Sequence, residues 1–193
     1  SFESWFAGTP GMKVVAPSNP ADAKSLLIAS IEDDDPVLFV ENLPIYKEKG
    51  LVPLTNEPAE LGRAARVREG SDLTVVSHGF STVRVTRIAD RLREEGIHLD
   101  VIDLRTLRPL DFETVAQSVQ KTNRAVCVEE GWASYGASAE LAARISYACF
   151  DDLDAPVERV GSIEVPLPYA KNLETVATPN EDRIERAIRA TLG

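Results

Sequence analysis

The first forty residues alternate between β-prone and helical patterns of apolar residues. Residues 13–16 form a short β-prone run, and Asn19 followed by Pro20 is typical of a helix start, because Asn caps free amides and Pro lacks one. A helical face of apolar or small residues follows, at Ala23, Leu26, Leu27, Ser30 and Ile31. The run Asp-Asp-Asp-Pro at 33–36 ends that helix, and the apolar run 37–40 predicts a buried strand. The pattern predicts one β-α-β unit, which exposes sheet edges unless a partner covers them.

A second and longer stretch of alternating patterns follows an irregular segment. Residues 42–66 contain several prolines and mixed charge, which is typical of an interdomain linker. Beyond it, strands are predicted over 72–77, 97–104, 124–129 and 156–160, and helices over 80–95, 112–121, 136–150 and 182–192. A proline-rich loop over 161–179 precedes the last helix. Because strands and helices alternate at short spacing, the sequence predicts an α/β fold with a three-layer, mostly parallel sheet.

The composition of the 193 residues is that of a globular protein, with 44% hydrophobic residues, which excludes disorder and collagen-like repeats. Lys and Arg number 21 and Asp and Glu number 31, so the formal net charge is −10. This acidic balance argues against nucleic acid as a partner, because nonspecific binding needs clustered cations. The longest apolar stretch, residues 26–31, is far shorter than the roughly 20 residues of a membrane span, so no membrane partner is predicted.

Two further features bear on the chain's origin and location. Residues 1–6 carry neither the basic nor the apolar region of a signal peptide, and we expect part of a domain to precede them. Cys127 and Cys149 lie on patterns typical of buried elements. They are interpreted as reduced core thiols of an intracellular protein, with a disulfide as the alternative.

Familiar catalytic motifs are scarce in this sequence. It lacks G-x-S-x-G, H-E-x-x-H, paired C-x-x-C and P-loop motifs. Of its two histidines, His78 follows a predicted strand, where loops of α/β sheets face ligands. A polar residue of a βα turn is the simpler interpretation of His78, and His98 is interpreted as a half-exposed strand residue.

The end of the first predicted helix is the strongest candidate for a cation site. The last carbonyl groups of a helix lack partners and carry partial negative charge, and three carboxylates at 33–35 add to it. Oxygen ligands suit a hard cation, so Ser30, Ile31, Asp33 and Asp35 are candidate metal ligands. An exposed acidic turn remains the alternative, and a divalent catalytic metal is disfavoured because no second ligand cluster is visible.

Two later segments are candidates for contacts or acid–base chemistry. Residues 129–132, Glu-Glu-Gly-Trp, end a predicted strand, where paired carboxylates can exchange protons or dock a partner's cations. A polar strand end is the alternative. Residues 165–170, Val-Pro-Leu-Pro-Tyr-Ala, hold an aromatic residue beside a stiff extended backbone. That arrangement suits a subunit contact, and a stiff surface loop is the alternative.

Several segments in order resemble the beta subunits of thiamine-diphosphate-dependent 2-oxoacid dehydrogenases. The N-terminal segments 1–6, 10–15 and 22–24 resemble the second half of their pyrimidine-binding domain, and 101–111, 128–132 and 165–170 resemble their transketolase-like C-terminal domain. The resemblance implies a partial pyrimidine-binding domain over 1–43, a linker over 44–66 and a transketolase C-terminal-like domain over 67–193. The motifs are more similar to pyruvate members than to branched-chain members, and acetoin dehydrogenases remain close.

The resemblance also implies an activity, cofactors and partners. The family oxidatively decarboxylates a 2-oxoacid and passes the acyl group to a lipoyl-acyltransferase, using thiamine diphosphate. An alpha subunit holds the cofactor's diphosphate and magnesium, and beta-subunit residues upstream of this chain complete the site. The implied partners are that alpha subunit, a second beta subunit in a heterotetramer, and the dihydrolipoyl acyltransferase core. The implied location is the cytoplasm, or the mitochondrial matrix or plastid in a eukaryote.

A structural potassium ion is the one site that the resemblance places on this chain. Family members bind it mainly through backbone oxygens, at positions that match Ser30, Ile31, Asp33 and Asp35. No catalytic or cofactor-binding residue is assigned, so we expect the chain alone to be inactive. A noncatalytic assembly module and a free-standing α/β ligand-binding domain are the alternative functions.

Overall fold

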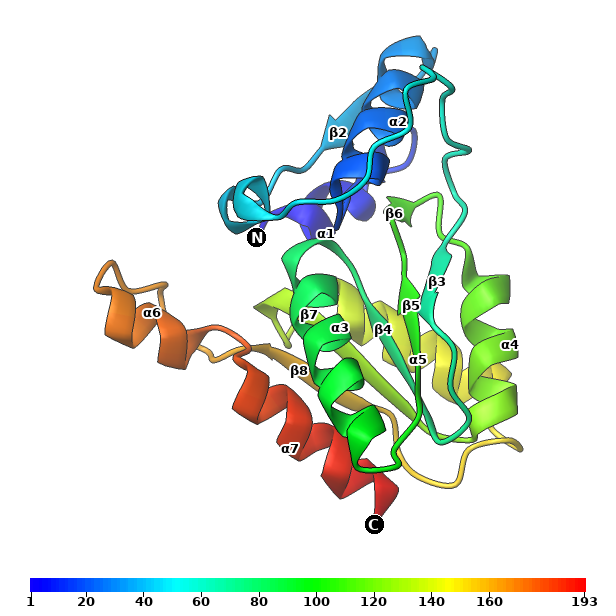
Figure 1. The fold of residues 1–193 in the computed structure, drawn as a ribbon, viewed down its shortest axis with the longest axis vertical. Helices are drawn as coiled ribbons and strands as arrows, with labels where there is room; N and C mark the ends of the chain where they lie inside the picture. The colour runs from blue at the N-terminus through cyan, green and yellow to red at the C-terminus, as the bar shows by residue number, and fades with distance from the viewer.

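Two β-sheets of unequal size organise the chain (Figure 1). The computed structural model describes all residues, 1–193. The smaller sheet has the order β2-β1-β6, from β1 (Lys13–Val15), β2 (Val37–Phe39) and β6 (Thr106–Arg108). The larger has the order β3-β5-β4-β7-β8, from β3 (Ala65–Arg68), β4 (Leu73–Ser77), β5 (Leu99–Asp103), β7 (Ala125–Trp132) and β8 (Glu158–Ser162). The helices are α1 (Glu3–Ala7), α2 (Pro20–Glu32), η1 (Leu43–Lys47, a 3₁₀ turn), α3 (Gly79–Glu94), α4 (Phe112–Thr122), α5 (Ala137–Ala148), α6 (Lys171–Ala177) and α7 (Glu181–Leu192).

The larger sheet is the middle of three layers, which confirms the predicted fold class. Its pairs β4–β5, β4–β7 and β7–β8 are parallel, and only the edge pair β3–β5 is antiparallel. Alternate strand residues point to opposite faces. Thus Val75 packs in a 13-residue cluster with α3 and α7, while Val76 packs in a 12-residue cluster with α4 and α5. Helices therefore cover both faces (Figure 1).

Local signals placed most of the helix ends correctly. The Asn19 side chain accepts a hydrogen bond from the Asp22 amide at the start of α2, and Asp111 does the same for Thr114 at the start of α4. These caps satisfy amides that have no partner within the helix. Gly96 follows α3 with a φ of +84°, a conformation that glycine adopts without steric cost.

The burial predicted for the N-terminal β-α-β unit is wrong in part. The strand β2 is half-buried rather than buried, because it forms the edge of the smaller sheet. On α2 only Leu26 and Ala29 are buried, whereas Leu27 and Ile31 of the predicted apolar face are exposed. No other element of the chain covers the side of α2 that carries Leu27 and Ile31.

Five short elements were not predicted from the sequence, namely α1, η1, β3, β6 and α6. The strand β3 lies where the linker was predicted to end, and α6 lies within the predicted proline-rich loop. The strand β6 pairs antiparallel with β1, through Val14 with Arg108 and Val15 with Thr106. The smaller sheet therefore combines strands from both sides of the irregular segment, although the predicted domain limits themselves remain a prediction.

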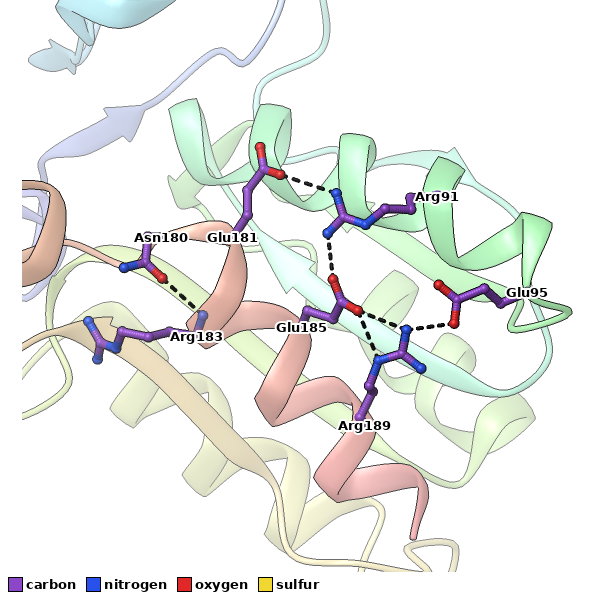
Figure 2. A network of polar contacts seen from close by, with 7 residues as sticks. All are labelled: Arg91, Glu95, Asn180, Glu181, Arg183, Glu185 and Arg189. Carbon is purple, nitrogen blue, oxygen red and sulfur yellow. Dashed lines mark hydrogen bonds and ion pairs between the residues drawn. The ribbon is translucent and has the colours of Figure 1, made fainter.

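The last helix is held to α3 by buried apolar residues and by an exposed network of charges. Figure 2 shows Arg91 of α3 between Glu181 and Glu185, and Arg189 between Glu185 and Glu95. The distances are 2.5 Å from Arg91 Nη2 to Glu185 Oε2 and 2.6 Å from Arg189 Nη2 to Glu95 Oε2. By contrast, α6 projects from the body of the molecule (Figure 1).

Two smaller expectations can also be compared with the structure. Cys127 and Cys149 are both buried and free, as the patterns around them predicted. Burial raises the pKa of the Cys127 thiol to about 12, so it is an unreactive core residue. None of the helices is both long enough and apolar enough to cross a membrane.

Candidate functional site

The predicted cation site lies at the C-terminal end of α2, where a lysine neutralises the carboxylates. Lys13 Nζ lies 2.7 Å from both side-chain oxygens of Asp33 and 3.1 Å from Asp35 Oδ2. This contact lowers the pKa of Asp33 and raises that of Lys13. Lys13 was not predicted as part of this site, because twenty residues separate it from Asp33 and β1 brings it there only in the folded chain.

The backbone at this helix end is the remaining source of ligands. Ser30 Oγ donates to the Leu26 carbonyl 2.7 Å away, so its hydroxyl is already used. Asp33 is extended, with φ −76° and ψ 137°, and ends the helix. The carbonyls of the last turn have no successor amides within the helix. Side-chain geometry alone forms no metal centre, since no group of three or more His, Cys, Asp or Glu is arranged to hold an ion.

Glu129 is a buried helix cap rather than a free acid–base group. It is 2% exposed, and its carboxylate accepts hydrogen bonds from the amides of Ala137 at 3.1 Å and Ser138 at 2.8 Å and from the Ser138 hydroxyl. The negative charge thus lies at the N-terminus of α5, where the helix dipole stabilises it. Glu129 joins β7 to α5.

Glu130 lies in a second polar cluster that connects β7 with the N-terminal residues. Its Oε2 accepts from Asn42 Nδ2 at 2.9 Å, and its Oε1 lies 3.4 Å from Arg84 Nη1. Burial raises the pKa of Glu130, and the nearby Arg84 opposes that effect. Glu130 therefore already contacts a cation of its own chain, Arg84. Docking of a partner's cations by Glu130 stays a prediction.

Asp103 is a buried carboxyl that the sequence analysis did not select. It ends β5, is fully buried, and accepts hydrogen bonds from the Ser18 hydroxyl and from the Arg105 amide at 3.1 Å. Burial raises its pKa to about 6. The available signal was an Asp at the end of an apolar strand in the run 101–104, which is also where α/β sheets place functional groups.

The two histidines lie in different environments. His78 is 7% exposed and is the N-cap residue of α3, without a side-chain capping hydrogen bond. It lies near enough to Glu130 and Asp103 to lower the pKa of both carboxyls. His98 is exposed and immediately precedes β5. Of the predicted candidates, the structure therefore gathers His78, Glu129 and Glu130 at the carboxyl ends of the strands, away from the end of α2.

The segment that was predicted to make subunit contacts is open to solvent in this single chain. Tyr169 is fully exposed, and Leu167, Leu173 and Val176 around it are exposed as well. One contact anchors the start of the loop, where Trp132 Nε1 donates to the Val165 carbonyl at 3.1 Å. The apolar residues on this segment have no cover within the chain.

A hollow of about 620 Å³ lies between α1, the segment after β5, and α5. Its floor contains buried Leu104, Leu107 and Leu141, and its rim carries Arg108 and Arg144. Arg108 Nη1 donates to a carbonyl of α1, and Arg144 stacks on Phe112 with 4.3 Å from its guanidinium carbon to the ring centroid. Both cations therefore already have partners.

Comparison with protein families matches two successive parts of the chain. The family described as the C-terminal domain of transketolase matches residues 62–184, and the pyrimidine binding domain of transketolase matches residues 1–48. The first match alone covers more than half of the chain.

Curated relatives match almost all of the chain. A pyruvate dehydrogenase E1 component subunit beta from Rickettsia conorii is 43% identical over 189 residues, which are 98% of this chain and 58% of that protein. A mitochondrial subunit beta-1 from Arabidopsis thaliana is 43% identical over 96% of this chain and 52% of its own length. The chain thus spans about half the length of these relatives.

A solved structure supports the fold. A split gene transketolase, described as an inactive beta4 tetramer, superimposes with a TM-score of 0.76 and 23% identity. The match covers 98% of this chain and 60% of that one. At that identity the likeness concerns the fold alone.

Proposed function

The chain belongs to the transketolase family, and from that premise we propose that it is part of the beta subunit of the E1 component of a pyruvate dehydrogenase complex. The supporting observation is the 43% identity to such a subunit over 98% of this chain. The activity of that complex is the oxidative decarboxylation of pyruvate with acetyl transfer to a lipoyl-acyltransferase. The proposed location is the cytoplasm in a bacterium and the mitochondrial matrix or a plastid in a eukaryote.

In this proposal the cofactor is held mainly by groups outside the chain. Thiamine diphosphate, bound with magnesium through the alpha subunit, supplies the carbanion chemistry of decarboxylation. The chain's own buried carboxylates are already used, because Glu129 caps α5 and Asp103 binds Ser18. We therefore assign no cofactor contact to them, and the chain contributes scaffold and contact surface.

The partners follow from the proposed complex and from the exposed apolar residues. They are the alpha subunit, a second beta subunit in a heterotetramer, and the dihydrolipoyl acyltransferase core. The segment around Tyr169, which is fully exposed in the single chain, is the proposed subunit contact. The domain limits 1–43, 44–66 and 67–193 belong to the same proposal, supported by the irregular backbone between η1 and β3.

The experiment is competition for the alpha subunit of a bacterial pyruvate dehydrogenase. We expect the 193-residue chain to displace intact beta subunit and thereby inhibit pyruvate decarboxylation, without supporting it. Tyr169→Ala should weaken that inhibition about ten-fold or more, as contact aromatics commonly do. Tyr147→Ala, at an equally exposed tyrosine on α5, is the matched control and should leave it unchanged.

Each other outcome of this competition is informative. Absence of any displacement would contradict the assignment as a subunit. Turnover by the chain together with the alpha subunit would contradict the scaffold role. Stronger displacement from a branched-chain or acetoin dehydrogenase would transfer the proposal to that enzyme, and binding without any effect on turnover would favour a noncatalytic assembly module.

The proposed potassium site has Ser30, Ile31, Asp33 and Asp35 as its residues. The backbone oxygens at the end of α2 fit such an ion, because they carry partial negative charge. The Asp33 carboxylate is already paired with Lys13, so the proposed ligand from Asp33 is its backbone oxygen. Potassium there would neutralise the helix end and supply no step of the reaction.

Thermal unfolding in K⁺ and in Na⁺ at equal ionic strength tests this site. We expect K⁺ to raise Tm more than Na⁺ does. The double variant Asp33→Ala, Asp35→Ala should reduce the difference, because it keeps the backbone oxygens but leaves the Lys13 charge unopposed beside the ion. Ser30→Ala is the control, because it removes a hydroxyl bonded to Leu26 and keeps the backbone oxygen. Equal responses of the unsubstituted chain to both ions would refute the site.

A further inference from the structure

The junction between the N-terminal part (residues 1–48) and the C-terminal part (residues 62–193) is built from backbone pairing and apolar contact. The strand β1 pairs with β6, and the Ala16 amide donates to the Arg105 carbonyl at 2.8 Å. Val14 is fully buried in the same cluster as Leu104 and Leu107. The junction is therefore a packed interface rather than a loose tether.

Several ionisable side chains of the C-terminal part bind across this junction. Among them, Arg105 pairs with Asp22, Glu130 accepts from Asn42, and Asp103 binds Ser18. Asp103, which is fully buried at the carboxyl end of β5, accepts a hydrogen bond from the hydroxyl of Ser18 in the N-terminal part. From its own part it accepts from the Arg105 amide at 3.1 Å and, more weakly, from Thr82 Oγ1 at 3.4 Å. Its neighbours are thus neutral donors.

The charged groups that face Asp103 leave it without an ion-pair partner. Asp22 of α2 lies near it and disfavours its charge, whereas His78 before α3 favours it. The cation of Arg105 is engaged elsewhere, since Nη2 lies 2.7 Å from Asp22 Oδ1. No Lys, Arg or His nitrogen lies within 4.0 Å of the Asp103 carboxylate. A buried carboxylate with hydrogen bonds but no cation is costly to ionise.

We propose that Asp103 is a pH-sensitive latch, whose neutral form keeps the N-terminal and C-terminal parts closed against each other and whose ionised form loosens their junction. This inference does not depend on the proposed function.

The direction of the effect follows from burial. In the closed junction, burial raises the pKa of Asp103 from an ordinary 3.8 to about 6. Opening the junction exposes the carboxyl to water, so its pKa there returns toward the ordinary value. Protonation therefore favours the closed form, fully below about pH 4, and this contribution is lost as the pH rises through about 6. The opening equilibrium should increase on the order of a hundred-fold across that range.

A second buried carboxylate supplies a matched control. Asp100 is also fully buried on β5, but it lies 3.2 Å from Arg66 Nε and 3.3 Å from Lys121 Nζ and accepts from Ser118 Oγ. All of these partners belong to the C-terminal part. Substitution of Asp100 therefore removes a buried charge without touching the junction.

Amide hydrogen exchange on the full chain between pH 4.5 and 7.5 tests the latch. The measured quantity is the protection factor of the Ala16 amide relative to that of the Val75 amide, corrected for intrinsic exchange. Ala16 reports the junction, and Val75 lies in the core of β4. We expect the ratio to fall at least ten-fold as pH rises, to lose most of this pH dependence in Asp103→Asn, and to keep it in Asp100→Asn.

Further variants and outcomes keep the test decisive. Ser18→Ala removes the hydrogen bond across the junction and should lower Ala16 protection more than Val75 protection at every pH, even where Asp103→Asn does not fold. The latch is overturned by a pH-independent ratio in the unsubstituted chain. It is equally overturned if Asp103→Asn retains the pH dependence, or if Ala16 and Val75 lose protection together.

Discussion

The two parts of the chain differ in how completely they bury their own apolar residues. In the C-terminal part, helices cover both faces of a five-stranded sheet, and the 13-residue cluster on one face belongs wholly to that part. In the N-terminal part, the sheet has two strands of its own and takes β6 from the other part. Trp5 and Ile31 remain 70% and 75% exposed there. The comparison indicates that the C-terminal part carries most of the folding free energy.

Apolar side chains have different roles in the two parts of the chain. Residues such as Ile88 and Ile188 are fully buried within the chain and stabilise it by leaving water. Exposed residues such as Trp5 contribute nothing of that kind in the isolated chain. Contiguous exposed apolar residues are typical of surfaces that contact other proteins, which agrees with the proposed role as one subunit of a larger complex.

The largest expected effect comes from truncating one core residue in each part. Ile102→Ala should lower the free energy of unfolding by about 4 kcal/mol, because Ile102 is fully buried between β5 and the helices on that face. Leu38→Ala, on the half-buried β2, should lower it by only about 1 kcal/mol. Urea unfolding followed by circular dichroism measures both. Equal losses of unfolding free energy in the two variants would contradict the view that the C-terminal part carries most of the stability.

The cap of α5 gives the next effect, and it lies wholly within the C-terminal part. Glu129→Ala should cost about 3 kcal/mol, because it leaves the buried Ser138 amide and hydroxyl without their acceptor. Glu129→Gln keeps one acceptor oxygen and nearly the same volume, so its loss should be about 1 kcal/mol. The same urea titration measures them. If Gln were as damaging as Ala, the carboxylate charge rather than the hydrogen bonds would hold α5.

What the sequence predicted well is what local chemistry determines. Asn19 and Asp111 start helices because their side chains reach amides three residues ahead. The strands β4 and β5 are recognisable because Val, Leu and Ile are frequent in them, as in parallel strands buried on both faces. These features do not require knowledge of distant contacts.

What the sequence did not reveal depends on distant residues. The strand β6 has three residues and exists because β1 pairs with it. Lys13 neutralises Asp33 only once β1 lies beside the end of α2. One hydrogen bond that Asp103 accepts likewise comes from Ser18, which lies 85 residues earlier. Exposure of Leu27 and Ile31 was also missed, because a helical pattern shows which residues share a face and not whether anything covers it.

The smallest expected effect separates buried contact from surface charge at α7. Arg91→Gln removes the ion pairs with Glu181 and Glu185 that Figure 2 shows, and it should lower Tm by less than about 3 °C, because exposed ion pairs are weak. Ile188→Ala on the same helix, at a fully buried position, should lower Tm several times more. Differential scanning calorimetry at low and high salt measures both, and only the Arg91→Gln difference should shrink with salt. A loss from Arg91→Gln as large as that from Ile188→Ala would mean that charge, rather than apolar burial, attaches α7 to the C-terminal part.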